Sequence, residues 1–209
     1  RSVSRGLGDV YKRQIQKYKI KGFVISNLSN LKFLKGYKSN FEIIGNSSLN
    51  IFNNYSIKEC AEYGINKVTL SRELSKTELE DILKYNLDID TELIVYGTLP
   101  IMSCNYCFLG KSNMCYPECK RLCSDDNSYY LKDRLGFKFR IVSDNIQSIT
   151  SIFNSKILSI SPKTFNVSSV RIDILDENVT TINKIIETVK SGKSFEGKEY
   201  TSGRLEEEK

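Results

Sequence analysis

Short apolar runs alternate with helix-like segments over the first half of the chain. The runs that predict strands are Gly22–Asn27, Phe41–Asn50, Asn66–Leu74 and Thr91–Gly97. They are continuous apolar runs, and about a helix's length of chain separates each from the next. This pattern predicts parallel strands covered by helices.

Two of the intervening segments have clear helix signals. The segment Ile57–Gly64 has helical spacing and stops at a glycine, where a left-handed cap costs least. Ser75 and Glu78 have the spacing of a capping box, in which both side chains satisfy backbone donors at a helix start. One buried face is then predicted from Leu79, Ile82 and Leu83.

The second half begins with a different pattern. Residues Tyr129–Val142 alternate aromatic or aliphatic with charged side chains around Leu135-Gly136, which predicts an antiparallel β-hairpin. A strand over Val167–Leu175 and a helix then restore the earlier pattern, the helix with one face formed by Val179, Ile182, Ile186 and Val189. We therefore predict an α/β fold with an insert of roughly residues 104–165. An open doubly wound sheet and part of a TIM-type (β/α) barrel both fit.

Composition and charge change this picture mainly at the N-terminus. The chain has 209 residues, 40% of them hydrophobic, and a net charge of +6. Residues 1–14 have no apolar period and resemble translated adapter read-through, so we exclude them from the fold. They hold four basic residues and one acidic residue, so the rest of the chain has a net charge of +3. A net charge of this size is weak evidence for a polyanionic partner. We expect a fragment that lacks its N-terminal part.

The chain has no run of about 18 apolar residues and no signal-peptide core, which predicts a cytoplasmic protein without a membrane segment. In a reducing compartment, clustered cysteines more often bind metal than form disulfides. Five of the six cysteines lie between Cys104 and Cys123, spaced C-x2-C-x7-C-x3-C-x3-C. The chain contains no histidine, which excludes Cys/His zinc sites and imidazole general bases.

An all-thiolate site suits zinc or an iron–sulfur cluster. Because only one CxxC pair is present, the spacing favours iron–sulfur over zinc, with unmetallated thiols as a third alternative. Cys60 stands apart in a helical segment and is expected to be an ordinary buried thiol.

Several motifs in register resemble the bacterial U32 peptidase family, of the clostridial type. They are LNIFN, GINKVTLSREL, ELIVYGTLPIMSCNYC, YYLKDRLGFKFRI and TSIFNSKIL, with EGKEYTSGR similar to the family's barrel-exit motif. The resemblance covers roughly residues 20–205 and implies a partial TIM-type barrel. Residues 15–103 would supply its later βα units, 104–165 a cysteine-rich metal-binding insert with the hairpin, and 166–209 the final βα unit and tail.

The resemblance also implies a chemistry. Members studied as enzymes resemble [4Fe-4S] proteins that hydroxylate a base in tRNA or rRNA, or a quinone precursor, without molecular oxygen; prephenate is a cosubstrate for some. The implied cluster ligands are Cys107, Cys115, Cys119 and Cys123, with Cys104 as a spare. Many relatives place a cluster cysteine where this chain has Ser148, so either Cys123 is the fourth ligand or one iron is open.

Two alternative functions remain. Other members of the family are described as collagen-degrading peptidases, although this chain has no HExxH and no nucleophile elbow. A cluster or a zinc ion can also act only as a structural staple of an interaction module.

Other candidates have two interpretations each. Glu73 and Glu92 are weak candidates for general acid/base groups at a barrel mouth, or for structural ion pairs with Arg72 or Lys67. Asn50, like Asn53, can bind a polar substrate or serve only the turn after a strand.

The predicted hairpin places Tyr129 and Tyr130 close to Lys132 and Arg134. These side chains can stack on RNA bases and bind phosphates, or simply pack as alternating hairpin residues.

Overall fold

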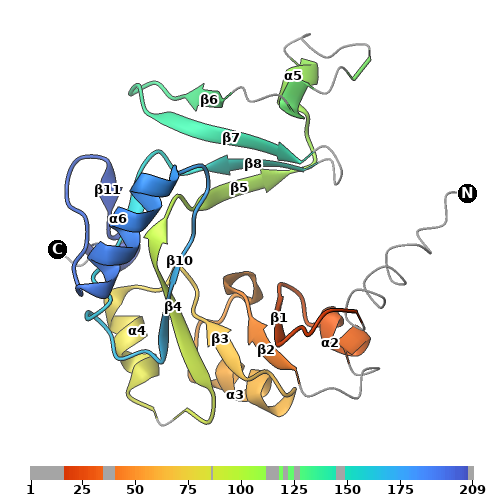
Figure 1. The fold of residues 1–209 in the computed structure, drawn as a ribbon, viewed down its shortest axis with the longest axis vertical. Helices are drawn as coiled ribbons and strands as arrows, with labels where there is room; N and C mark the ends of the chain where they lie inside the picture. The colour runs from red at the N-terminus through yellow and green to blue at the C-terminus, as the bar shows by residue number, and fades with distance from the viewer. Residues whose placement is uncertain are drawn as a thin grey trace, which may run out of the picture. The chain divides into compact units, whose positions relative to one another are not determined.

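The computed structural model describes residues 17–34, 41–85, 87–111, 118–119, 122–124, 128–144 and 149–206. The chain divides into two compact units, whose elements are labelled in Figure 1. The first unit runs to Leu93 and includes Val167–Ser169; the second comprises Ile94–Asn166 and the chain from Val170 onward. None of the described helices is long and apolar enough to cross a lipid bilayer.

Parallel strands form the centre of the first unit. They pair in the order β1 (Gly22–Ile25), β2 (Glu42–Gly45), β3 (Lys67–Thr69) and the first half of β4 (Asp90–Gly97). The helical elements between them are α2 (Ser29–Leu34), the 3-10 turn η1 (Ser47–Leu49), α3 (Asn54–Glu62) and α4 (Lys76–Leu83). The prediction of parallel strands separated by helices is confirmed.

Side-chain caps fix where α3 and α4 begin. Asn53 accepts a hydrogen bond from the backbone N–H of Ser56 at 2.9 Å. Ser75 and Glu78 form the predicted capping box, with Ser75 Oγ accepting from Glu78 N at 3.3 Å and Glu78 Oε2 accepting from Ser75 N at 2.8 Å. The buried residues of these helices are Ile57 and Cys60 in α3 and Leu79 and Ile82 in α4.

Two strands, β2 and β3, end well before the predicted ends of their apolar runs at Asn50 and Leu74. β2 ends at Gly45 because Asn46 accepts a hydrogen bond from Ser47 N at 2.9 Å and caps η1. β3 ends at Thr69, although Leu70 and Leu74 beyond it are buried. The strands predicted as far as residues 50 and 74 are therefore wrong at their ends, because burial of a loop residue gives the same apolar signal as a strand.

The second unit contains a small mixed sheet. The second half of β4 pairs antiparallel with β9 (Ile157–Ser159), and β9 pairs in parallel with β11 (Tyr200–Thr201). β10 (Ser169–Ile172), within the predicted strand 167–175, also pairs with β4. A Cβ on Gly97 would lie 2.6 Å from the Asp173 carbonyl oxygen, and its φ is +149°, so this close approach requires glycine.

Helix α6 (Val179–Lys190) starts at the N-cap Asn178 and is followed by β11 and the 3-10 turn η3 (Gly203–Glu206). Its buried residues are Ile185 and Val189, whereas Val179 is 73% exposed. The helix itself is confirmed, but Val179, the first residue of the predicted apolar face, is exposed. Val179 lies in the first turn, and the face that packs begins one turn later.

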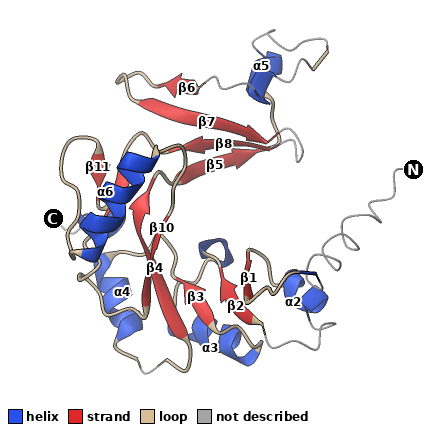
Figure 2. Cartoon of the chain, viewed as in Figure 1, coloured by secondary structure: helices blue, strands red, loops and turns tan. Residues whose placement is uncertain are grey.

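An antiparallel sheet forms the rest of the second unit. Its strand order is β5 (Pro100–Cys104), β8 (Ile149–Phe153), β7 (Lys138–Asp144) and β6 (Tyr129–Lys132), drawn as arrows in Figure 2. β6 and β7 form the predicted hairpin, so that prediction is confirmed. The short elements α5 (Phe108–Lys111) and η2 (Leu122–Ser124) lie between β5 and β6 in the chain.

The α/β class is confirmed, with a sheet that contains parallel strands and a separate antiparallel sheet. Among the described strands no pairing links β11 to β1, so these strands do not close a barrel. Membership of a larger TIM-type barrel stays a prediction, as do the insert boundaries 104 and 165.

Candidate functional site

Four polar residues form a row where the parallel pairing of β1, β2, β3 and β4 ends. The register pairs Ile25 with Gly45, Gly45 with Val68 and Val68 with Thr91. The residue that follows each of these four positions in the chain is polar. We call these residues the polar row: Ser26, Asn46, Thr69 and Glu92. In parallel α/β sheets this edge is where ligands and reacting groups gather.

Hydrogen bonds join the polar row in two pairs. Asn46 Nδ2 donates to Ser26 Oγ at 3.1 Å, and Thr69 Oγ1 donates to Glu92 Oε1 at 2.9 Å. Thr69 is fully buried, whereas Glu92 is half-buried. The second carboxylate oxygen of Glu92 has no hydrogen-bond partner in the described part of the chain. Thr69 therefore fixes one oxygen of this carboxylate and leaves the other able to accept a proton or a ligand N–H.

Lys67, one of the two predicted ion-pair partners of the glutamates, pairs with another residue, and an ion pair with Arg72 stays a prediction. Lys67 Nζ lies 3.9 Å from Glu42 Oε1 across the β2–β3 pair. Glu73 is exposed in the loop after β3, and its backbone N–H donates to Ser71 Oγ at 3.3 Å. Of the two candidate glutamates, the structure places Glu92 in the polar row and Glu73 on the following loop.

The two candidate asparagines have local structural roles. Asn50 adopts the left-handed conformation with φ of 52°, and its N–H closes η1 by donating to Ser47 O. Asn53 is the N-cap of α3. Turn and cap chemistry thus accounts for both residues, and a substrate contact by Asn50 stays a prediction. Asn46, which sequence reasoning missed, is the asparagine in the polar row.

The stretch from Cys104 to Cys123, which we call the cysteine segment, begins where β5 ends. Cys104 Sγ donates to the Thr150 carbonyl oxygen of β8 at 3.8 Å, and Thr150 Oγ1 donates to the Tyr106 carbonyl oxygen at 2.6 Å. Cys107 is exposed, and its Sγ accepts a hydrogen bond from Gly110 N at 3.4 Å. N–H donors to sulfur of this kind tune the properties of metal-bound cysteines.

Aromatic contacts connect the two ends of the cysteine segment. The Phe108 and Tyr129 rings meet edge to face at 5.2 Å, and Tyr129 OH donates to the Leu122 carbonyl oxygen at 3.2 Å. Phe108 follows Cys107 and Leu122 precedes Cys123. This series of contacts holds the segments that carry Cys107 and Cys123 against the same hairpin strand, and Figure 1 shows α5 at one end of the antiparallel sheet.

The predicted ligand set is only partly within the described residues. Cys119 is exposed and Cys123 half-buried, whereas Cys115 and Ser148 lie outside the described residues. No three cysteine or carboxylate side chains within the described ranges are grouped closely enough to hold a metal ion. The donor chemistry fits a thiolate-bound cluster, but the assignment of the four ligands stays a prediction.

Cys60, predicted to be an ordinary buried thiol, is 5% exposed in α3. Burial raises the pKa of its thiol, and the nearby Glu59 carboxylate adds to this effect. Cys60 is therefore held as the neutral thiol, which is unsuited to bind metal at neutral pH.

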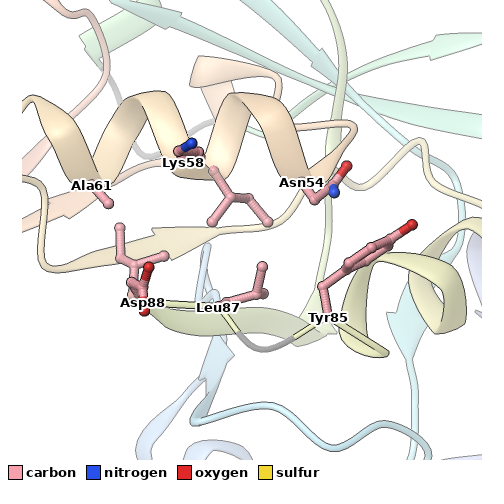
Figure 3. Close-up of a pocket in the computed structure, with 8 residues that line it drawn as sticks. Asn54, Lys58, Ala61, Tyr85, Leu87 and Asp88 are labelled. Carbon is pink, nitrogen blue, oxygen red and sulfur yellow. The ribbon is translucent and has the colours of Figure 1, made fainter.

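A small pocket of about 150 Å³ lies beside α3 in the first unit. Figure 3 shows Asn54 and Lys58 of α3 on one side and Tyr85, Leu87 and Asp88 on the other. The last three precede β4, so the pocket lies towards the amino end of that strand and contains no residue of the polar row. We assign it no role in the candidate chemistry.

Comparison with known proteins gives one family. The family model described as Peptidase family U32 matches residues 9–175. This range contains the polar row, the cysteine segment and the hairpin. Searches of curated proteins and of solved structures returned no match.

Proposed function

The chain belongs to peptidase family U32, and from this premise we propose that it is an iron–sulfur enzyme that hydroxylates an RNA base without molecular oxygen. The observation that supports the proposal most is the donor set. Five cysteines lie within 21 residues of a chain that has no histidine. Thiolates in this number and setting suit iron–sulfur ligation.

Four of these side chains would hold the cluster, namely Cys107, Cys115, Cys119 and Cys123. A bound [4Fe-4S] cluster would supply redox and Lewis-acid chemistry towards an oxygen-bearing cosubstrate, with prephenate as our candidate. Gly110 N–H would stabilise the Cys107 thiolate through the 3.4 Å contact already present. Tyr129 would keep the Cys123 turn in place through its bond to Leu122.

Glu92 is the residue of the polar row best suited to handle a proton. Thr69 orients its carboxylate through Oε1, and the second oxygen can accept a hydrogen bond from a substrate N–H or O–H. Asn46 and Ser26 add amide and hydroxyl groups that can orient a polar substrate along the same edge. We assign no catalytic step to Glu73 or Asn50.

Peptidase activity is the second candidate, because the matching family model carries that description. A chain without histidine cannot form a Ser–His or Cys–His pair from its own residues. A peptidase mechanism would therefore have to use a carboxylate such as Glu92, or residues beyond this sequence.

RNA from a deletion strain tests the proposal directly. We expect mass spectrometry of its nucleosides to show loss of one hydroxylated nucleoside. The wild-type gene and a Cys60→Ala variant should restore it, whereas Cys107→Ser and Glu92→Gln should not. An unchanged nucleoside profile together with a defect in peptide turnover would support the peptidase instead.

The choice of fourth ligand has its own test. We expect Cys123→Ser to remove the cluster and Cys104→Ser to retain it, because Cys104 already bonds to the Thr150 carbonyl oxygen. Iron retained by Cys123→Ser and lost by Cys104→Ser would show that the ligand choice is wrong.

A further inference from the structure

One face of the β6–β7 hairpin carries aromatic and basic side chains together. Side chains alternate between the two faces of a strand, and the register pairs Tyr130 with Arg140 and Lys132 with Lys138. These four residues, which we call the hairpin face, therefore point to the same side. Tyr129 points to the other side, where its ring contacts Phe108.

Contacts with Arg140 hold the Tyr130 ring in position. Its side chain is 53% exposed, and the Arg140 guanidinium carbon lies 5.5 Å from the ring centroid. Arg140 Nε in turn donates to Asp176 Oδ2 at 3.2 Å. This pair holds the guanidinium against one side of the Tyr130 ring, so the ring is positioned before any partner arrives.

Arg140 also retains unused hydrogen-bonding capacity. Its Nη1 is buried, and no group in the described part of the chain accepts a hydrogen bond from it. A buried donor without an acceptor is unfavourable, so an acceptor brought by a ligand would relieve this cost after a small side-chain shift.

The hairpin carries two lysines that form no ion pair with a carboxylate in the described part of the chain. Lys132 and Lys138 are exposed and directly opposite each other, an arrangement that destabilises a strand pair. Among the described residues Asp133, between the strands, forms no ion pair with either lysine, and its Oδ1 accepts from Leu135 N and Phe137 N at 2.9 Å each. Within the described ranges, no ion pair involves either lysine.

We propose that the hairpin face binds an unpaired segment of the RNA substrate, an inference that rests on the function proposed above. A base would stack on the exposed side of Tyr130, and phosphates would contact Lys132 and Lys138. Exposed aromatic rings flanked by cations bind single strands in this way, since every base has a π-face and the backbone is anionic. An acidic peptide would satisfy the lysines but would not use the ring.

Fluorescence anisotropy of the full chain with a labelled single-stranded RNA of about 12 nucleotides tests this proposal. We expect Tyr130→Ala to bind roughly tenfold more weakly and Tyr130→Phe to bind nearly as well as wild type. Lys132→Glu should weaken binding and lower the slope of log affinity against log salt by about 1. Tyr63→Ala is the matched control, because Tyr63 is 52% exposed in the first unit; Lys198→Glu controls for net charge.

Three results would overturn the proposal. They are no binding of the RNA probe by wild type, equal affinity of Tyr130→Ala and Tyr63→Ala, and equal effects of Lys132→Glu and Lys198→Glu. In those cases the lysines only keep the β6 edge from pairing with other sheets. Because iron content and the nucleoside profile do not depend on this assay, a failure here is distinguishable from a failure of the proposed function.

Discussion

Removal of the Thr69 hydroxyl should measurably destabilise the first unit. Thr69 Oγ1 donates to Glu92 Oε1 at 2.9 Å, and the Thr69 side chain is fully buried. A hydrogen bond to a charged acceptor contributes about 1.5–3 kcal/mol, and the partial exposure of Glu92 favours the lower bound. We expect Thr69→Val to lower the free energy of unfolding by about 1.5 kcal/mol. In a chain of 209 residues this equals a fall in melting temperature of about 3–6 °C.

A double-mutant cycle isolates this pair. Urea unfolding followed by circular dichroism would compare wild type, Thr69→Val, Glu92→Ala and the double variant. Valine keeps the β-branched shape of threonine, so the coupling energy reports the hydrogen bond, and we expect about 1 kcal/mol. Thr180→Val, at an exposed position of α6, is the control and should stay within about 0.5 kcal/mol of wild type.

Additive effects of Thr69→Val and Glu92→Ala would show that this hydrogen bond does not stabilise the protein. The two side chains would then not interact in solution, and Thr69 could not orient the Glu92 carboxylate. A Thr69→Val variant as stable as Thr180→Val would lead to the same conclusion.

Substitutions at Tyr96, Gly110 and Ser75 should each have a measurable effect. Burial, with the Glu177 carboxylate adding to it, raises the pKa of Tyr96 to about 12 from about 10 in an unfolded chain. Between about pH 10 and 12 only the unfolded chain loses the Tyr96 proton, so the free energy of unfolding of wild type should fall by up to about 2.7 kcal/mol over this range. If the urea midpoint of Tyr96→Phe fell as steeply with pH, Tyr96 would not be the group responsible. Gly110→Ala should retain iron, because its Cβ would lie at an ordinary contact distance of 3.7 Å from Cys107 Sγ. Gly110→Pro removes the N–H donor and should bind iron less tightly in a chelator competition. Equal iron affinities of the two variants would show that the Gly110 N–H is unimportant. Ser75→Ala should lower the free energy of unfolding by about 1 kcal/mol in urea titrations through loss of the α4 cap, and no change would mean that the capping box is not formed in solution.

The sequence was most informative where structure is determined locally. The capping box of Ser75 and Glu78 and the turn at Leu135-Gly136 depend on neighbours within a few residues, and the structure confirms both. β5, β8 and β9 were not predicted as strands. β5 and β9 pair with strands far along the chain, as for Cys104 with Thr150, and β8 pairs with β5 as well as with the neighbouring β7. Each of the three strands has only three to five residues. Such strands are defined by tertiary pairing more than by their own apolar pattern.

The candidate site was predictable only in part. Glu92 was identified because it stands near the start of a strand, but Thr69 and Asn46 were missed. Both follow the apolar part of a parallel strand, where polar residues usually indicate only a turn. The feature that distinguishes them is the register across strands more than 20 residues apart in sequence, as in the Thr69–Glu92 bond. A sequence without aligned relatives does not contain that register in readable form.

We propose that thiolates of the cysteine segment bind a [4Fe-4S] cluster, and the decisive test is metal analysis of the anaerobically reconstituted protein. We predict about four irons and four sulfides per chain with broad absorbance near roughly 400 nm, lost in Cys115→Ser and retained in Cys60→Ala. Colourless protein with one zinc ion per chain, or an iron content that Cys115→Ser leaves unchanged, would show that these thiolates do not bind such a cluster.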